Sequence, residues 1–442
     1  MSAPLLHIET TSVLPEAADV VVIGGGVVGV FTAYYLARRG VSVALLEKGR
    51  IAAEQSSRNW GWCRQQNRDG RELPMATASL DLWDRLAGDI GQDVGFRRCG
   101  LLYLSNDAAE IARWAKWRDF ARSVGVTTHM LSAEQAAERG RATGRNWAGG
   151  VFSPDDGIAD PARSVPLVAQ SIPDFGGSVH QMCAARGLER SGGRVSAVVT
   201  ERGTIRTRTV VMAGGAWASS FCRQLGIRFP QSAVRASILA VAPHVAGLPD
   251  ALHTADISIT RRGDAEGHTL AVSGRASVDP TPQQLLYARE FLPMFARRWR
   301  ALRPGGLGGW RAGHEMTGRW RLDAPTPMER RRILDPEPDR RVVALTYRRA
   351  LDLLPALRGT TIKATWGGYI DSTPDGVPAI GEVTGMPGFL LAAGFSGHGF
   401  GIGPGAGHLV ADIVTGAEPL VDPQPYHPDR FSGSAWGRVA EF

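Results

Sequence analysis

Cysteine is scarce in this sequence, and the few copies are far apart. The four thiols, Cys63, Cys99, Cys183 and Cys222, form no C-x-x-C pair and no Cys/His group with metal-ligand spacing. This scarcity excludes a disulfide-stapled scaffold and predicts reduced thiols and no metal site. The residues before Asp19 also lack the basic start and apolar core of a secretory signal. We therefore expect a cytoplasmic protein.

Long hydrophobic runs and nucleic-acid-binding motifs are also missing. Residues 20–36 are uncharged, but a run of 17 residues is at the lower limit for crossing a bilayer. The sequence thus predicts no integral membrane span and no nucleic-acid partner. The net charge is +7, and part of the positive charge lies in arginine clusters at 297–298, 330–332 and 340–341. Apolar and acidic residues interrupt these clusters, which favours solvated surfaces over contact with acidic lipid or nucleic acid.

Apolar residues are plentiful enough for a large folded protein. Of the 442 residues, 43% are hydrophobic and 21% are charged, which is typical of a globular chain. This length is about two to three times that of an ordinary domain, so we expect two lobes. The sequence contains no internal repeat and no low-complexity segment, so nothing of that kind points to another architecture.

The most informative segment is 19–47, which has the form of a βαβ dinucleotide-binding unit. A buried-strand run at 19–23 leads into Gly24, Gly26 and Gly29, which give the pattern G-x-G-x-x-G. The first glycine allows a tight turn, the second lets the backbone approach a pyrophosphate, and the third lets helix and strand pack closely.

The rest of the unit supports the same interpretation. An apolar helical pattern at 27–39 begins directly after the glycines, so its first N–H groups would face the phosphates. A second strand at 41–46 ends in Glu47, which is placed for a ribose hydroxyl. A tight turn without a ligand would not require Glu47, so we predict a bound dinucleotide.

A polar loop follows this acid. Ser56, Ser57, Arg58 and Asn59 offer hydroxyl, amide and guanidinium groups that suit phosphate oxygens, although an ordinary surface loop would look similar.

Two further glycine turns occur much later in the chain. A strand at 204–212 ends in Ala213-Gly214-Gly215, where no side chain would separate the backbone from a flat ligand. A third glycine-rich loop, at 394–403, lies between an apolar strand at 388–393 and an apolar helix at 406–414. Flexible linkers are not bracketed in this way, so this loop is a second strong indication of a ligand.

With these motifs, the chain resembles the D-amino-acid-oxidase-type flavoproteins, the group of glycine oxidase, sarcosine oxidase and D-amino acid dehydrogenases. The resemblance covers about residues 18–420. It implies that the βαβ unit holds the ADP part of FAD and that the loop at 394–400 lies beside the isoalloxazine. It further implies a helix beginning near Gly403 whose positive end faces the flavin's pyrimidine edge.

The resemblance assigns cofactor contacts throughout the chain. Val195 would contact adenine through its backbone, and the absence of the attachment cysteine used by monomeric sarcosine oxidase implies dissociable, non-covalent FAD. The full predicted set of FAD-binding residues is Gly24, Gly26, Val28, Gly29, Glu47, Lys48, Ser56, Ser57, Arg58, Asn59, Val195, Ala213, Gly214, Trp217, Gly394, Gly397, His398, Gly399, Phe400 and Gly401.

The sequence departs from the family where glycine oxidase places an arginine for the substrate carboxylate. Residues 366–371 contain no arginine. Arg348 is our chosen substitute, with Arg319, Arg321 and Lys363 as alternatives; otherwise the substrate has no carboxylate at that place.

Two further residues are catalytic candidates. His398 lies in the flavin loop and is predicted to shape the pocket or tune the flavin, and Tyr369 is predicted to line the substrate pocket. His314 fits a structural role better than that of a base. Trp60 and Trp62 suit either an aromatic pocket wall or packing between lobes.

The predicted fold class is α/β, a Rossmann-like FAD-binding domain with an inserted antiparallel-sheet α+β substrate domain. We assign 18–95, 145–233 and 359–420 to the FAD-binding domain and 96–144 and 234–358 to the substrate domain. Residues 1–17 and 421–442 are predicted to be terminal extensions.

These observations predict an FAD-dependent amine or amino-acid oxidase or dehydrogenase. Hydride transfer from the substrate to flavin N5 would give an imine, which water then hydrolyses. The electron acceptor would be O₂, a quinone or another carrier, and the chain is compatible with a homo-oligomer. Two alternatives are a flavin-binding subunit of a multi-subunit amine dehydrogenase and a nicotinamide-dependent dehydrogenase.

Overall fold

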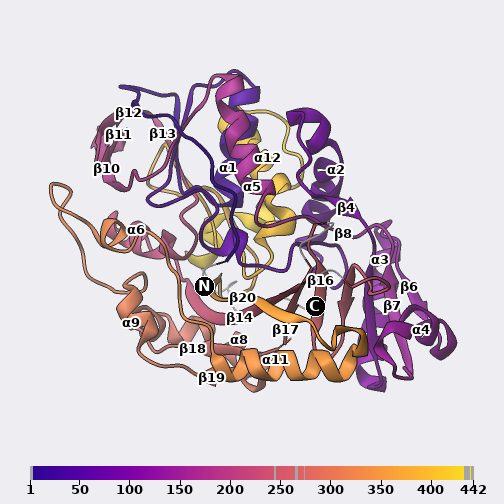
Figure 1. The fold of residues 1–442 in the computed structure, drawn as a ribbon. Helices are drawn as coiled ribbons and strands as arrows, with labels where there is room; N and C mark the ends of the chain where they lie inside the picture. Colours follow the sequence, from indigo (N-terminus) through magenta and orange to yellow (C-terminus); the bar gives the residue numbers. More distant parts are fainter. Residues whose placement is uncertain (1–2, 243–244, 264–266, 273, 433–438, 440–442) are drawn as a thin grey trace.

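A six-stranded sheet contains the predicted βαβ unit (Figure 1). The computed structural model describes residues 3–242, 245–263, 267–272, 274–432 and 439. The sheet order is β21-β22-β13-β1-β2-β9, parallel except for the β21–β22 pair. Its strands are β1 (Val20–Ile23), β2 (Val43–Leu46), β9 (Ser178–His180), β13 (Thr209–Met212), β21 (Ala379–Glu382) and β22 (Phe389–Ala393).

Both faces of this sheet are covered, so β1 and β2 are apolar at every position. Val20 and Val22 of β1 face a core formed with α1 (Val27–Arg38), α5 (Ser164–Ser171) and α12 (Gly399–Thr415). Val21 and Ile23 face a second core. A three-stranded sheet contributes to that core, namely β10 (Ala185–Ser191), β11 (Arg194–Thr200) and β12 (Gly203–Arg206).

Helix α12 begins earlier than expected. The sequence predicted a helix near Gly403, whereas the structure has it from Gly399. A Cβ on Gly403 would lie 2.4 Å from Val27 Cγ2, and one on Gly407 would lie 2.6 Å from the Phe31 carbonyl carbon. The glycines therefore let α12 lie directly on α1, and this packing offsets their low helix propensity.

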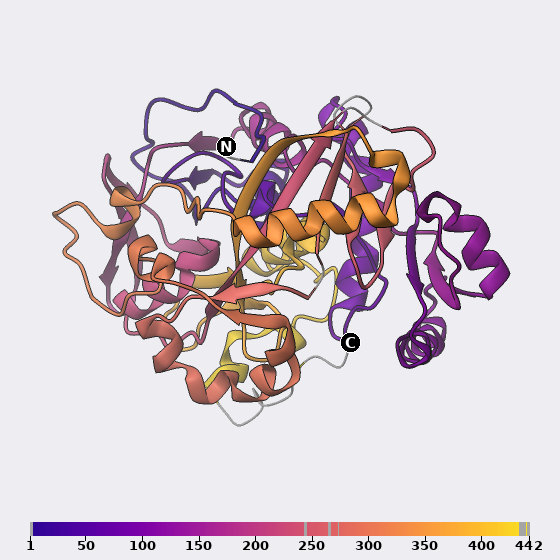
Figure 2. The same cartoon turned by 60° about the horizontal axis from the view of Figure 1, so that its bottom comes forward.

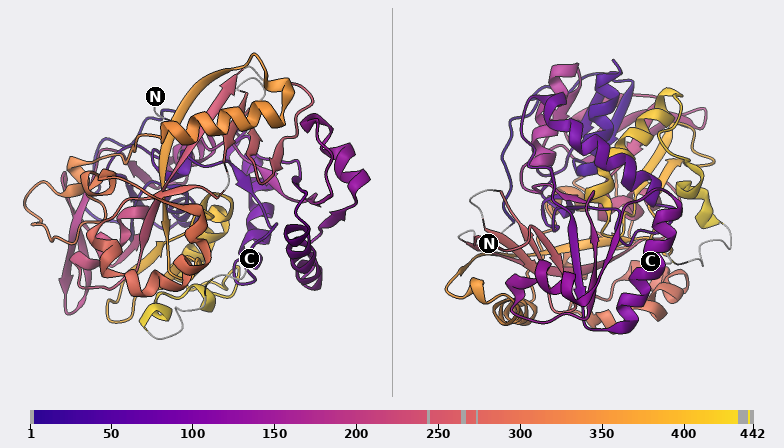
Figure 3. Two further views of the ribbon diagram at one scale, coloured as in Figure 1. Left: turned by 90° about the horizontal axis from the view of Figure 1, so that it is seen from below. Right: turned by 90° about the vertical axis from the view of Figure 1, so that its right-hand side faces the viewer.

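The second large sheet of the protein has ten strands (Figures 2 and 3). Helix α11 (Arg340–Leu353) packs across it, and its Ala350 and Leu353 join a core with Leu239 and Leu270. The strands are β5 (Leu101–Ser105), β6 (His129–Leu131), β7 (Gly149–Ser153), β14 (Ser232–Ala242), β15 (Ala251–His253), β16 (Ser258–Arg261), β17 (His268–Ala271), β18 (Ala276–Val278), β19 (Leu302–Pro304) and β20 (Thr361–Ser372).

The strand pairing differs in two places from the residue ranges that we predicted for the two domains. Strands β7 and β20 lie in ranges that we gave to the FAD-binding domain, yet they pair with β5 and β14 of the large sheet. Hydrogen-bond partners of antiparallel strands are set by tertiary packing, which the local sequence does not reveal. The sheet is also not purely antiparallel, since β5 runs parallel to β15 and β18 to β19. The division into two domains stays a prediction.

The remaining elements surround these sheets. No helix in the described ranges is both long and apolar enough to span a membrane. The other helices and strands are α2 (Leu73–Ile90), α3 (Ala108–Ser123), α4 (Ala133–Arg139), α6 (Ala218–Gln224), α7 (Pro282–Leu286), α8 (Ala288–Arg298), α9 (Gly308–Ala312), α10 (Pro327–Arg330), β3 (Trp62–Cys63), β4 (Arg97–Arg98) and β8 (Gly157–Ile158).

Candidate active site

One large cavity lies between the two main sheets. Its volume is about 340 Å³, within the roughly 300–1,000 Å³ of ordinary ligand pockets. The carboxyl ends of β1, β13 and β22 form one side, and residues of β14 and β20 form the other. Ligands of open parallel sheets bind at this edge of the strands.

Most of the predicted site residues line this cavity. They are Gly24, Gly26, Val28, Glu47, Lys48, Ser56, Arg58, Asn59, Ala213, Gly214, Trp217, Tyr369, Gly397, His398, Gly399, Phe400 and Gly401. The predicted residues outside the lining are Gly29, Ser57, Val195, Gly394 and Arg348. The three distant glycine turns therefore meet at one cavity.

Gly29 and Gly394 support the site from behind. A Cβ on Gly29 would lie 1.9 Å from the Gly24 carbonyl oxygen, and one on Gly394 would lie 2.4 Å from Thr373 Cγ2. Val195 of β11 is buried in the second core of the six-stranded sheet, the one that Val21 and Ile23 face. These residues set the positions of the turns and do not form the wall themselves.

At the βαβ unit, the carboxylate of Glu47 accepts from the Gly25 N–H at 2.8 Å and the Gly49 N–H at 2.7 Å. Burial raises the pKa of Glu47, and these two N–H groups oppose the shift. The side chain is thus fixed beside Gly25, at the edge of the cavity.

Hydrogen bonds tie the polar loop to α1 and to β20. Ser56 Oγ accepts from the Val27 N–H at the start of α1, and the Asn59 amide donates to the Ser56 carbonyl at 2.8 Å. The Arg58 guanidinium is buried and donates to Asp335 at 2.6 Å and to the Gly367 carbonyl at 2.8 Å. Arg58 therefore joins the loop to β20 as well as lining the cavity.

Two helices direct their first turns at the same cavity. Val27 and Val28 of α1 and Gly399 to Gly401 of α12 all belong to its lining. The dipole of a helix start, and those of its N–H groups that have no partner, favour negative charge. The cavity thus suits a ligand with anionic groups at two separate places.

The sequence pattern of the DAO family, described as FAD dependent oxidoreductase, matches residues 19–413. This chain belongs to that family. It is an FAD-dependent oxidoreductase, and the cavity fits the cofactor because glycine backbone and two helix starts border it.

Curated relatives of this FAD-dependent oxidoreductase share about a quarter of its residues. Glycine oxidase from Pseudomonas putida is 27% identical over 93% of this chain and 98% of its own length. Mitochondrial sarcosine dehydrogenase from mouse is 27% identical over 95% of this chain, but the chain spans only 42% of that protein. Sarcosine oxidase subunit beta from Arthrobacter is 24% identical over 94% of the chain.

Solved structures confirm the fold. The L-amino acid deaminase from Proteus myxofaciens, in complex with anthranilate, has a TM-score of 0.91 and 30% identity and covers 97% of both chains. Glycine oxidase from Geobacillus kaustophilus has a TM-score of 0.75 at 23% identity. The predicted α/β class with an FAD-binding Rossmann-like part is thereby confirmed.

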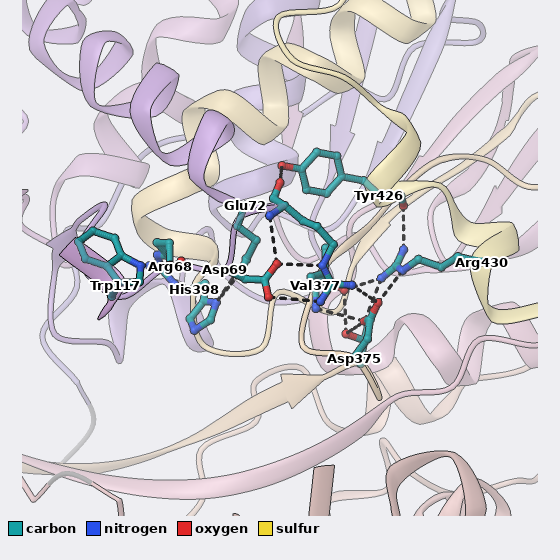
Figure 4. Close-up of polar contacts among 11 residues, drawn as sticks. Arg68, Asp69, Glu72, Trp117, Asp375, Val377, His398, Tyr426 and Arg430 are labelled. Atoms are coloured by element: carbon teal, nitrogen blue, oxygen red, sulfur yellow. Dashed lines mark hydrogen bonds and ion pairs between the residues drawn. The ribbon is translucent and has the colours of Figure 1, made fainter. Parts of the chain in front are cut away.

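His398 is held by a buried carboxylate that the sequence did not reveal (Figure 4). Its Nδ1 lies 3.1 Å from Glu72, which precedes α2 and is fully buried. Burial lowers the pKa of His398 to about 4, aided by the charge of Arg68 and opposed by Glu72. When Glu72 is ionised it accepts from Nδ1–H, which leaves Nε2 as a hydrogen-bond acceptor.

Arg64 and Arg68 are further lining residues that the sequence analysis missed. Arg68 is only 2% exposed, and its Nη1 has no hydrogen-bond partner in the described structure. Burial and the neighbouring Arg64 lower the pKa of Arg68 to about 10, so it stays charged near neutral pH. A buried unpaired charge is costly, and an anion in the cavity would offset that cost. The signal available in the sequence was an R-x-x-x-R spacing directly after Cys63.

The arginines and lysine that we predicted to bind a carboxylate lie elsewhere. Arg348 is exposed on α11, outside the cavity lining, so the structure does not support its assignment as a site residue. Arg319, Arg321 and Lys363 are also exposed. The sequence shows which positive residues precede the third glycine loop, but it does not show which positive residue of the chain faces the cavity.

Aromatic side chains form part of the wall. Trp60 and Trp62 line the cavity and meet edge to face, with ring centroids 4.8 Å apart. Tyr369 also lines it and packs against His314, whose ring centroid is 4.6 Å away. His314 itself lies outside the lining and is fully buried, in keeping with a structural role.

We expect His314 to make the protein sensitive to acid. Burial lowers its pKa from 6.5 to about 4, and neither ring nitrogen has a hydrogen-bond partner among the described residues. Because the folded pKa is depressed, its contribution is complete above pH 6.5 and is lost as the pH falls toward 4. At pH 5 the loss is about 2 kcal/mol.

The substitution His314→Phe keeps the ring and removes the titration. Its melting temperature should therefore fall less between pH 7 and pH 5 than that of the wild type, measured by thermal unfolding across that range. His129→Gln, on an exposed position, is the matched control and should follow the wild type. Parallel pH curves for His314→Phe and wild type would contradict the expectation.

Proposed function

We propose that this chain oxidises the C–N bond of a small amino acid and that Arg68, with Arg64, binds the substrate carboxylate. The single observation that supports this most strongly is the unpartnered Nη1 of Arg68 in the wall of the FAD cavity. The names of the relatives, glycine oxidase and L-amino acid deaminase among them, agree with a substrate of this class.

FAD, when bound among these glycine turns, would supply the two-electron oxidising chemistry at the carbon that carries the nitrogen. Arg68 and Arg64 hold the carboxylate and thereby fix the position of that carbon. His398 accepts a hydrogen bond from the amine through Nε2, while Glu72 keeps its Nδ1 protonated. The imine product leaves the cavity or is hydrolysed there by water to a carbonyl compound and an amine or ammonia.

Apolar groups complete the substrate end of the cavity. A Cβ on Gly401 would lie 2.8 Å from the Trp62 carbonyl oxygen, so the start of α12 and strand β3 are in direct contact. Trp62 and Phe400, both buried, place apolar rings in this wall. Apolar surroundings strengthen the attraction between a guanidinium and a carboxylate.

The test is an anaerobic flavin-bleaching screen with the purified chain alone. The panel contains L- and D-amino acids, N-methyl amino acids and the matching amines without a carboxylate. We expect bleaching by at least one amino acid and little or none by its decarboxylated counterpart. Equal bleaching by both would contradict the role of Arg68. No bleaching at all, with FAD bound, would favour the alternative of a subunit that needs partners.

A further inference from the structure

The surface formed by residues 284–313 combines exposed apolar side chains with a strong excess of positive charge. Of the 13 large hydrophobic residues exposed in the described structure, seven lie here. They are Leu285, Leu286, Leu292, Phe295, Trp299, Leu307 and Trp310, between 45% and 74% exposed. Scattered exposed apolar residues are ordinary, but a concentration of this kind marks an interaction surface.

The apolar residues of α8 form one stripe. Leu292, Phe295 and Trp299 follow the spacing i, i+3, i+7 and so share one side of the helix, which η5 (Trp299–Ala301) continues. The buried Glu290 lies on the opposite side and forms an ion pair with Arg228. The stripe therefore faces away from the protein, although it has the composition of a packed helix face.

Positive charge surrounds this stripe. The segment contains six arginines and one acid, Glu290, whose charge is already paired inside the protein. On the helix, Arg289 and Arg300 lie next to the apolar stripe, and both are exposed. The arginines of the segment are Arg289, Arg297, Arg298, Arg300, Arg303 and Arg311.

We propose that this surface docks on a negatively charged lipid bilayer, with Leu292, Phe295 and Trp299 entering the interface and the arginines contacting lipid headgroups. An amphipathic helix with Trp, Phe and Leu on one face and Arg beside it is the form that lies in a membrane interface. Anionic headgroups attract each such cation. A second copy of this chain would place arginines opposite arginines, which like-charge repulsion disfavours.

This surface lies near one side of the FAD cavity. A Cβ on Gly308 of α9 would lie 3.9 Å from the Tyr369 hydroxyl, and Tyr369 lines the FAD cavity. In Figure 1, α8 lies at the lower side of the molecule, below β14, and α9 lies to its left. Docking would hold that side of the cavity near the bilayer, within reach of a lipid-dissolved electron acceptor.

The experiment is sedimentation of the full-length, FAD-loaded protein with vesicles of phosphatidylcholine alone or with 30% phosphatidylglycerol, about a typical anionic content. We expect binding to the anionic vesicles, at least tenfold weaker binding to the neutral ones, and loss of binding as salt rises. The triple variant L292S/F295S/W299S and the charge variant R289E/R300E should each lower the bound fraction at least tenfold. All five positions are exposed, so FAD content and melting temperature should not change.

Two matched variants control for general effects. V124S/M182S removes exposed apolar side chains elsewhere, and R122E/R358E reverses exposed charges elsewhere, and both should bind as the wild type does. Equal binding by the L292S/F295S/W299S variant would overturn the proposal. A lack of vesicle binding by the wild type would also overturn the proposal. Light scattering would then show either a dimer, which the L292S/F295S/W299S variant dissociates, or a monomer, whose surface would serve another partner.

Discussion

Gly29→Ala should abolish FAD binding. The Cβ of alanine would lie 1.9 Å from the Gly24 carbonyl oxygen and 3.3 Å from the Ala213 Cβ. Both neighbours belong to turns at the cavity, and the nearer contact is to backbone that a side-chain rotation cannot relieve. Helix α1 would have to move away from β1, and its first N–H groups would leave the position that faces the cofactor.

The measurement is the ratio of flavin to protein absorbance after purification, with free FAD removed. We expect less than about a tenth of the wild-type ratio and a lower melting temperature, since bound FAD stabilises the folded state by mass action. Gly88→Ala is the control, because Gly88 lies within α2 and its Cβ would meet no atom within 4 Å. That variant should keep its FAD and gain up to about 1 kcal/mol. Normal FAD content in Gly29→Ala would show that the close packing is dispensable.

The βαβ unit could be predicted well because its signals are local. Strand β1, the glycines and helix α1 each follow from period and turn chemistry within 20 residues of sequence, and the structure has them where we expected. Helix α3 also has a local start signal, since Asp107 caps it by accepting from the N–H groups of Ala109 and Glu110.

The start of α12 and the pairing of β20 were not predictable in the same way. The first five residues of α12 include three glycines, which favour a loop when read locally, and only contact with α1 makes a helix of them. The long strand β20 pairs with β14, more than a hundred residues earlier. Such contacts depend on the assembled protein.

The carboxylate-binding residue illustrates this difference within the site. Arg348 satisfied the chemistry but lies on the outer side of α11, since Ala350 and Leu353 turn the other side of the helix to the core. Arg68 was hidden in a polar loop that resembled solvent-exposed sequence. Its direction is fixed by distant contacts, including the Trp117 indole N–H that donates to the Arg68 carbonyl at 2.9 Å.

Replacement of Arg68 by methionine should selectively weaken the binding of carboxylates. The change keeps an unbranched side chain of similar reach and removes the guanidinium whose Nη1 lacks a partner. A hydrogen bond to a charged group contributes about 1.5–3 kcal/mol, so the dissociation constant of a carboxylate ligand should rise about 10- to 150-fold. The neighbouring Arg64 retains part of the attraction, which places the expected value toward the lower end of that range.

The probe is an aromatic carboxylate such as anthranilate, titrated against the change that it causes in the flavin absorbance, so no knowledge of the substrate is required. Arg122→Met, on the exposed side of α3, is the matched control and should bind the probe as the wild type does. Removing a buried charge also removes its desolvation cost, so Arg68→Met should keep its FAD and melt no lower than the wild type. An unchanged dissociation constant in this stable variant would mean that the carboxylate is held by another group, and the substrate assignment would then lose its main support.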